Sequence, residues 1–201
     1  MLQSKMPNDL VAIKVLRARL APFGPVRRFV AGGERVSSQL VEQWRQATGG
    51  ELLNLYGMSE TFCACMVTPP GASDGARTGL PLPGVQVRLL DAEGREPPQG
   101  EPGVLWVRHP SQTSGYANLP EQTREQFREG WFCSRDLFMR DAAGYFIHQG
   151  RSDELVKVAG QWVQPGELEQ VAGLEPAVAE AACVTVLDAE GLERLALFVT
   201  G

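Results

Sequence analysis

The stretch "GRSDELVKVAGQWVQPGELE", residues 150–169, places a Gly-Arg-x-Asp corner in front of a short apolar segment and a proline. Its lysine, Lys157, is one of only three in the chain, and no lysine follows it. Pro165 suits the first turn of a helix, because its fixed φ and missing N–H are tolerated there. The stretch therefore predicts a strand, a turn and a helix that begins at Pro165.

The composition is that of a globular protein, with 43% hydrophobic and 21% charged residues in a chain of 201. A net charge of −5 gives no basic footprint for nucleic acid. No apolar run approaches the roughly 20 residues of a membrane helix, and no signal peptide follows Met1. The four cysteines lack zinc-ligand spacing, which favours reduced thiols. We therefore expect a cytoplasmic protein without a membrane span.

The pattern of apolar residues and turns divides the chain into three parts, expected at 1–76, 77–152 and 153–201. The first alternates helical and strand patterns, with helices over 9–21 and after Ser37, which predicts parallel α/β layering. The second has strands joined by the turns Asp-Ala-Glu-Gly and Asp-Ala-Ala-Gly, which predicts an antiparallel sheet or distorted barrel. A helix is expected within it over 118–130, ending at Gly130. The third part is expected to be α+β.

Two glycine-containing stretches follow predicted strands, "AGGERV" at 31–36 and "NLYGMSET" at 54–61. Ligands of open α/β sheets lie at the carboxyl ends of strands. There the Ser59 hydroxyl can donate to a phosphate oxygen, the Glu60 carboxylate suits Mg²⁺, and Tyr56 offers a stacking face. Plain turn chemistry is the structural alternative for both stretches.

A third candidate site combines Asp136, at the end of "WFCSRD", with Arg151 and Asp153. A carboxylate can accept hydrogen bonds from both hydroxyls of a ribose, and an arginine can donate to the same sugar. A surface Arg–Asp pair is the alternative interpretation.

In order and spacing, the segments "YGMSE", "TGLPLPGVQVRLLDAEGREPPQGEPGVLWVR", "GYANLPEQT", "WFCSRD" and 150–169 resemble the signature blocks of the acyl-adenylate-forming superfamily. That superfamily includes acyl- and aryl-CoA ligases, peptide-synthetase adenylation domains and luciferases. The stretch 150–169 and the "AGGE" turn most resemble benzoate-type aryl-CoA ligases. The resemblance implies a mixed α/β fold: part of a Rossmann-like subdomain, a small distorted β-barrel, and the start of an α+β lid.

The resemblance also implies a nucleotide site for ATP and AMP. Ser59 matches the hydroxyl that contacts the ATP phosphates, and Glu60 matches the carboxylate that holds Mg²⁺. Asp136 matches the aspartate that binds the ribose, with Arg151 beside it. The surface around the adenine matches Gly32, Gly33, Glu34, Tyr56 and Gly57.

The mobile lid of the family begins at the position of Asp153, which matches its hinge. Lys157 and Gly160 match the loop that turns inward for the thioester step, with Gly160 on the path of the pantetheine. The implied chemistry converts a small carboxylic acid, aromatic by preference, into an acyl-AMP. The thiol of coenzyme A then displaces AMP.

The sequence departs from the family pattern in several places. No phosphate loop ending in lysine appears in residues 1–60, and no catalytic lysine follows Lys157. Arg135 replaces the usual glycine before the ribose aspartate, and Val104 replaces a usual glutamate. We therefore expect a fragment of a ligase that is inactive alone and prone to associate or swap domains. A non-catalytic interaction module and an adenylation domain that loads a carrier protein are the alternatives.

Overall fold

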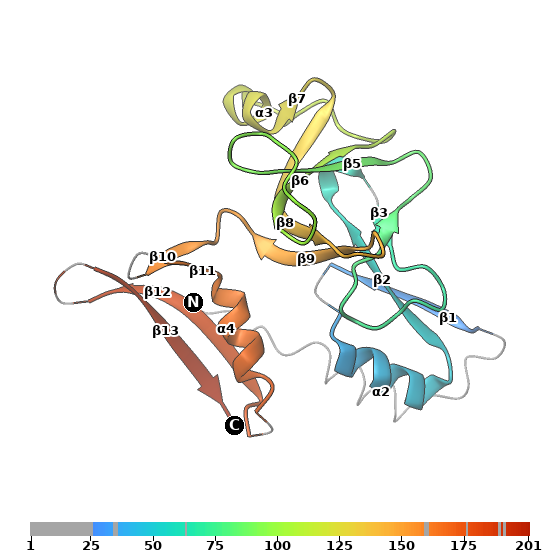
Figure 1. Cartoon of the computed structure of the whole chain (residues 1–201), viewed down its shortest axis with the longest axis vertical. Coiled ribbons are helices and arrows are strands. Elements are labelled where there is room, and N and C mark those ends of the chain that lie inside the picture. The colour runs from blue at the N-terminus through green and yellow to red at the C-terminus, as the bar shows by residue number, and fades with distance from the viewer. Residues whose placement is uncertain are drawn as a thin grey trace. The chain divides into compact units, whose positions relative to one another are not determined.

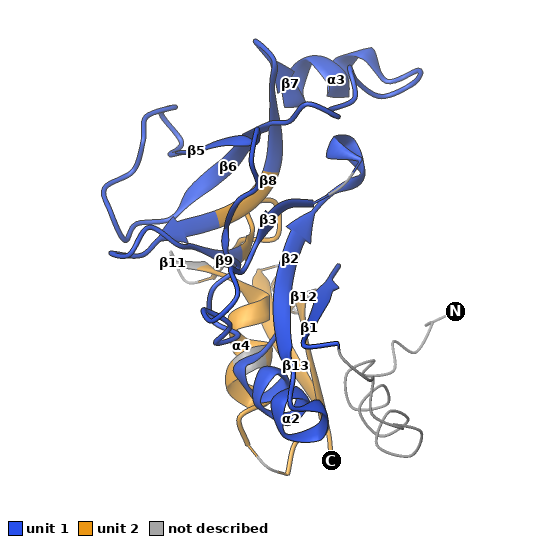
Figure 2. Cartoon of the chain, turned by 90° about the vertical axis from the view of Figure 1, so that its right-hand side faces the viewer, with its two compact units in different colours: residues 1–134, 138–149 blue, residues 135–137, 150–201 orange. Residues whose placement is uncertain are grey.

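The computed structural model describes residues 26–33, 36–62, 64–158, 161–175, 177–188, 190 and 192–201. The helix expected over 9–21 lies outside these ranges. The described chain forms two compact units, shown in different colours in Figure 2. Unit 1 extends to Ser134 and resumes at residues 138–149, whereas unit 2 comprises residues 135–137 and 150–201.

The first part of unit 1 is the expected parallel α/β layer (Figure 1). Strands β1 (Arg28–Gly32) and β2 (Glu51–Gly57) are parallel and are connected by helix α2 (Ser38–Thr48). The side chain of Ser37 accepts a hydrogen bond from the Leu40 N–H and caps the helix, as the sequence predicts. Gly49 ends it in the left-handed conformation, with φ +68°.

Two further strands complete this sheet in the order β1-β2-β3-β4. They are β3 (Ala64–Val67) and β4 (Leu80–Pro81), and a short 3₁₀ turn, η1 (Ser59–Thr61), connects β2 to β3. On the helix side, Val36, Val41 and Leu52 form a buried cluster. This packing fixes β2, the strand that leads to the Ser-Glu pair.

The second sheet has the order β5-β6-β8-β7, with β9 paired to β8, and it curls into a half-barrel. Its strands are β5 (Gln86–Leu90), β6 (Gly103–Arg108), β7 (Phe127–Arg128), β8 (Trp131–Arg140) and β9 (Phe146–Arg151). The two predicted turns are present: the Asp91 and Asp141 carboxylates each accept two backbone N–H groups of the turn that follows. The mixed α/β fold with a distorted barrel is therefore confirmed.

The helix expected to end at Gly130 is shorter than predicted. Helix α3 spans Pro120–Gln126, and the next two residues form β7, which pairs with β8. The turn between them consists of Glu129 and Gly130, with φ +52° and +78°. The Phe127 ring lies 4.9 Å from that of Phe132 across this hairpin. This aromatic pair stabilises the strand pairing, so the helix does not continue beyond Gln126.

Unit 2 has the expected strand, turn and helix after residue 153. Strands β10 (Val156–Val158) and β11 (Gln161–Val163) are antiparallel, and helix α4 (Pro165–Ala172) begins at the predicted proline. The long hairpin of β12 (Glu180–Leu187) and β13 (Glu193–Thr200) completes the unit. Glu169 on α4 accepts a hydrogen bond from the Cys183 N–H at 2.8 Å, which ties the helix to β12.

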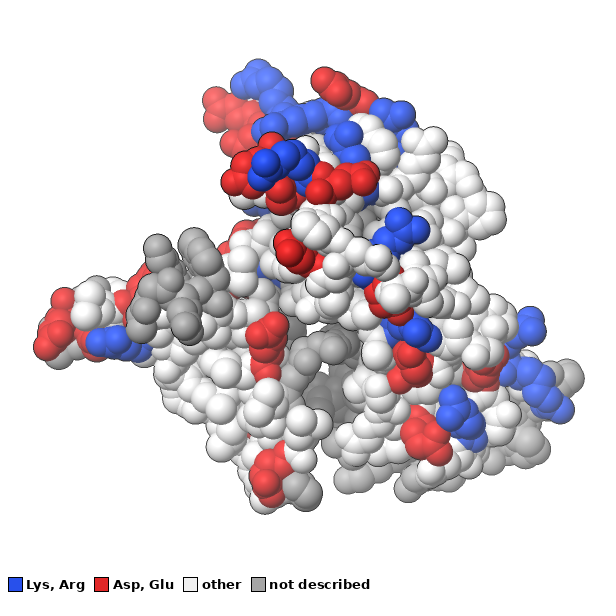
Figure 3. All heavy atoms as spheres, in the orientation of Figure 1, with Lys and Arg blue, Asp and Glu red and all other residues white. Residues whose placement is uncertain are grey.

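Basic and acidic side chains are interspersed on the face in Figure 3, and ion pairs such as Arg45–Glu42 join neighbours. Within the described ranges, no helix is long and apolar enough to cross a membrane. The three cysteines that the structure describes are free thiols.

Candidate functional site

The parallel pairing of β1 and β2 brings the first glycine-containing stretch beside the second. Gly32 pairs with Leu55, so Gly33 and Tyr56 follow at the same edge of the sheet. A Cβ atom on Gly32 would lie 2.5 Å from the Leu55 carbonyl oxygen, which only glycine avoids. Gly33 has φ +91°. Glu34 lies outside the described residues.

Tyr56 is half-buried at the end of β2. Its ring meets the Phe138 ring edge-on at 4.9 Å and lies 6.2 Å from that of His148. The register with β3 shifts between Tyr56 and Gly57, which marks a bulge at which Gly57 is exposed. Bulges are frequent next to functional sites because they redirect the chain.

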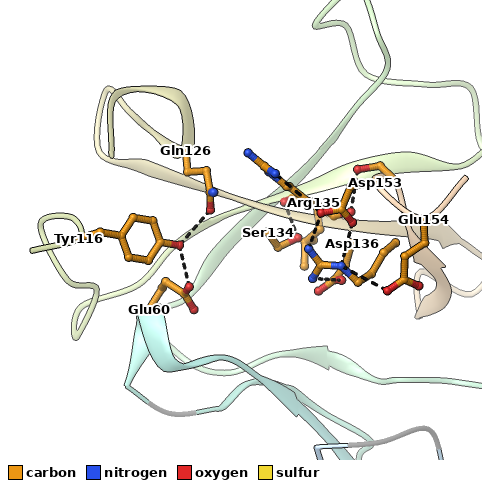
Figure 4. Close-up of polar contacts among 11 residues, drawn as sticks. Glu60, Tyr116, Gln126, Ser134, Arg135, Asp136, Asp153 and Glu154 are labelled. Atoms are coloured by element: carbon orange, nitrogen blue, oxygen red, sulfur yellow. Dashed lines mark hydrogen bonds and ion pairs between the residues drawn. The ribbon is translucent and has the colours of Figure 1, made fainter. Parts of the chain in front are cut away.

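Ser59 and Glu60 lie on η1, directly after this bulge, and the Ser59 side chain is exposed. The Tyr116 hydroxyl donates to Glu60 Oε1 at 2.7 Å and lies 2.9 Å from Gln126 Oε1 (Figure 4). We call Glu60, Tyr116 and Gln126 the Glu60 cluster. Sequence reasoning assigned no role to Tyr116, although "GYANLPEQT" was among the matched segments.

The structure brings Asp136, Arg151 and Asp153 together within unit 2. The two aspartates are labelled in Figure 4. Arg151 binds the Asp153 carboxylate with two hydrogen bonds of 2.8 Å, from Nε and Nη2. Its Nη1 lies 3.4 Å from Asp136 Oδ1. The Asp136 side chain is 15% exposed, compared with 41% for Arg151. Together with Arg135, these residues form what we call the Asp136 cluster.

The opposite charges of Arg151 and Asp153 each stabilise the ionised form of the other. The hydrogen bond from Arg151 lowers the pKa of Asp153 below its ordinary value, and the same bond raises the pKa of Arg151. Both groups are therefore ionised at neutral pH. The paired geometry fixes the guanidinium and directs Nη1 towards Asp136.

Arg135 has a left-handed backbone, with φ +63°, in the middle of strand β8. Its carbonyl accepts hydrogen bonds from the Ser152 N–H at 2.7 Å and from the Ser152 hydroxyl at 2.8 Å. Its guanidinium lies 3.7 Å from Asp153. This conformation costs a side-chain-bearing residue roughly 1–2 kcal/mol, a cost that glycine would avoid.

This strain predicts that the free energy of unfolding of Arg135→Gly will be about 1 kcal/mol higher than that of Arg135→Ala. Both variants lose the contact with Asp153, but only the glycine relieves the backbone. Urea denaturation of the two variants measures the difference directly. Equal midpoints would show that the left-handed backbone stores no strain.

The remaining predicted residues are Lys157 and Gly160. The backbone of Lys157 lies in β10, where it pairs with Trp162. The side chain of Lys157 and the whole of Gly160 lie outside what the structure describes.

No group of three or more metal-ligating side chains occurs among the described residues. A lone Glu60 nevertheless fits Mg²⁺, which is commonly bound by one or two carboxylates together with substrate phosphates.

Comparison with known proteins gives concordant matches. The model of the AMP-binding enzyme family matches residues 4–117. A 3-hydroxybenzoate–CoA ligase of Aromatoleum sp. (strain CIB) is 42% identical over 87% of this chain and 34% of its own length. An anthranilate–CoA ligase of Pseudomonas aeruginosa is 35% identical over 96% of this chain and 39% of its own.

Solved structures agree with these relatives. A benzoate CoA ligase from Burkholderia xenovorans LB400 superposes with a TM-score of 0.79 at 33% identity, over 91% of this chain and 36% of that one. The anthranilate CoA ligase AuaEII in complex with anthranoyl-AMP gives 0.76 at 32% identity, over 86% and 33%. The chain spans about a third of the length of the curated relatives it matches. The family model covers more than half of the chain, which therefore belongs to the AMP-binding enzyme family.

Proposed function

We propose that this chain is the nucleotide-contacting part of an ATP-dependent carboxylic acid–CoA ligase that acts on an aromatic acid. The observation that carries the proposal is the Asp136 cluster, in which a paired guanidinium lies against a mostly buried carboxylate. The names of the similar ligases, for 3-hydroxybenzoate and anthranilate, favour an aromatic substrate.

The proposed reaction has two steps. A carboxylate is a poor electrophile, so its oxygen attacks the α-phosphorus of ATP, forming acyl-AMP and releasing pyrophosphate. A thiol, here that of coenzyme A, then attacks the acyl carbon and releases AMP. Negative charge builds up on the phosphate in the first step, and Mg²⁺ bound through Glu60 would offset it.

The residues of this chain would hold the nucleotide in place. A carboxylate offers about four acceptor positions, enough for Asp136 to bind Arg151 and both ribose hydroxyls. Ser59 would donate to a phosphate oxygen. The adenine would lie against the glycine edge and Tyr56. Asp153 would act as the hinge, and Lys157 and Gly160 would act in the transfer to coenzyme A.

Calorimetric titration with AMP tests the proposal, using the parent chain and Asp136→Ala. We expect the parent to bind AMP and the substitution to weaken binding at least tenfold, because the ribose hydroxyls lose a charged acceptor. Glu154→Ala is the matched control, since it removes an exposed carboxylate only 3.9 Å from the same arginine. A folded parent that binds no AMP would overturn the proposal.

A non-catalytic module derived from a ligase is the second candidate, and Arg135 is the observation that favours it. A bulky cation in a strained conformation directly precedes the ribose aspartate. Absence of AMP binding in the parent and in Arg135→Gly would favour this candidate. A carrier protein is an alternative acceptor to coenzyme A, because a fatty acid–[acyl-carrier-protein] ligase of Streptomyces coeruleorubidus is 34% identical to this chain.

A further inference from the structure

Glu60 is held by a set of contacts that continues through two further residues. The Tyr116 phenol donates to the carboxylate at 2.7 Å, and Gln126, which is only 7% exposed, lies against the same phenol oxygen. A phenol has one proton, which goes to the charged acceptor, Glu60. A half-turn of the Gln126 amide then lets its NH₂ group donate to the phenol oxygen.

The segment "GYANLPEQT" is built to hold this phenol in place. The Tyr116 N–H donates to the Thr123 hydroxyl at 2.9 Å, and that hydroxyl donates to the Leu119 carbonyl. A Cβ atom on Gly115 would overlap the Thr123 side chain, so the close approach requires glycine. The Tyr116 ring also packs edge-on against Phe127 at 5.5 Å. Backbone, ring and hydroxyl are thus all fixed.

The backbone of Glu60 is tied to the same region. Its carbonyl accepts a hydrogen bond from the Thr113 N–H at 2.8 Å. Among the described residues, we find a donor to Oε1 of Glu60 but none to Oε2. The phenol thus occupies Oε1. The hydrogen bonds of the described residues leave Oε2 for single-oxygen coordination of a cation.

From these contacts we infer that Tyr116 is a positioning residue that orients Glu60 for Mg²⁺ coordination on the nucleotide phosphates. This inference rests on the proposed function. Mg²⁺ demands near-ideal octahedral geometry, so a carboxylate free to rotate binds it less well. Hydrogen-bonding partners of metal ligands commonly contribute 10–100-fold to metal affinity.

The test uses the whole chain and the variant Tyr116→Phe, which keeps the ring and its packing on Phe127. ATP affinity is measured by calorimetry over a series of Mg²⁺ concentrations, and AMP affinity is measured without Mg²⁺. We expect the Mg²⁺ concentration needed for half-maximal enhancement of ATP binding to rise roughly 10–100-fold. AMP affinity should change less than twofold. A general structural defect would lower AMP affinity as well.

Tyr145→Phe is the matched control, because that ring packs under the Arg77 guanidinium at 4.5 Å and takes no part in the Glu60 cluster. It should leave both affinities unchanged, whereas Glu60→Gln should abolish the Mg²⁺ enhancement. An unchanged Mg²⁺ requirement in Tyr116→Phe would overturn the inference and leave the proposed function intact. A parent chain without AMP affinity would overturn the proposed function and this inference with it.

Discussion

Replacing Gly79 with alanine is expected to lower the free energy of unfolding by roughly 3 kcal/mol or more. Gly79 has φ +130°, and a Cβ atom there would overlap the Val67 carbonyl in the neighbouring strand. Its own carbonyl accepts a hydrogen bond from the Phe146 N–H at 3.0 Å. Backbone strain and steric overlap with the Val67 carbonyl therefore act at the same position. The carbonyl group cannot move away without disrupting the pairing of β3 in the sheet.

Gly94→Ala is the matched control for this prediction. Gly94 also has positive φ, at +78°, but apart from its two chain neighbours no residue comes within 4 Å of the place that a Cβ atom would take. It should lose only the roughly 1–2 kcal/mol of the left-handed backbone. Urea denaturation of both variants separates the two contributions. Equal losses would show that the contact at Val67 relaxes without cost.

The parts of the fold that the sequence predicts depend on local signals. Helix α2 begins at Ser37 and ends at Gly49 because both caps are chemical features of single residues. The turn at Asp91 is likewise set by one carboxylate and the backbone that follows it. Strand β7 was missed because its pairing depends on Phe127 meeting Phe132 across a turn that also suits a helix end.

The candidate site shows the same division. Asp136, Arg151 and Asp153 were grouped from the sequence because two of them lie two positions apart in "GRSD", and the family spacing supplies the third. Tyr116 and Glu60 are 56 positions apart, and their hydrogen bond depends on how η1 meets the segment before α3. The conformation of Arg135 was equally hidden, since only the backbone shows that glycine was the unstrained choice.

The core of unit 1 stabilises the fold and also fixes Tyr56. Phe138 is fully buried in a cluster with Met66, Leu105 and Val107. Its ring meets that of Tyr56 edge-on at 4.9 Å and lies 5.0 Å from that of His148. Removing this ring leaves a cavity, because the close-packed neighbouring strands cannot move together to fill its space.

Phe138→Ala is therefore expected to cost about 3–5 kcal/mol of the free energy of unfolding. Phe62→Ala is the control: that ring is 86% exposed, so its removal should change stability by about 0.5 kcal/mol or less. Because the cavity also frees the Tyr56 ring, Phe138→Ala should weaken AMP binding at temperatures where it remains folded, as judged by near-ultraviolet circular dichroism. A Phe138→Ala variant as stable as the parent would show that the core closes around the missing ring without leaving a cavity. A destabilised variant with full AMP affinity would show that AMP binding does not depend on the contact between Phe138 and Tyr56.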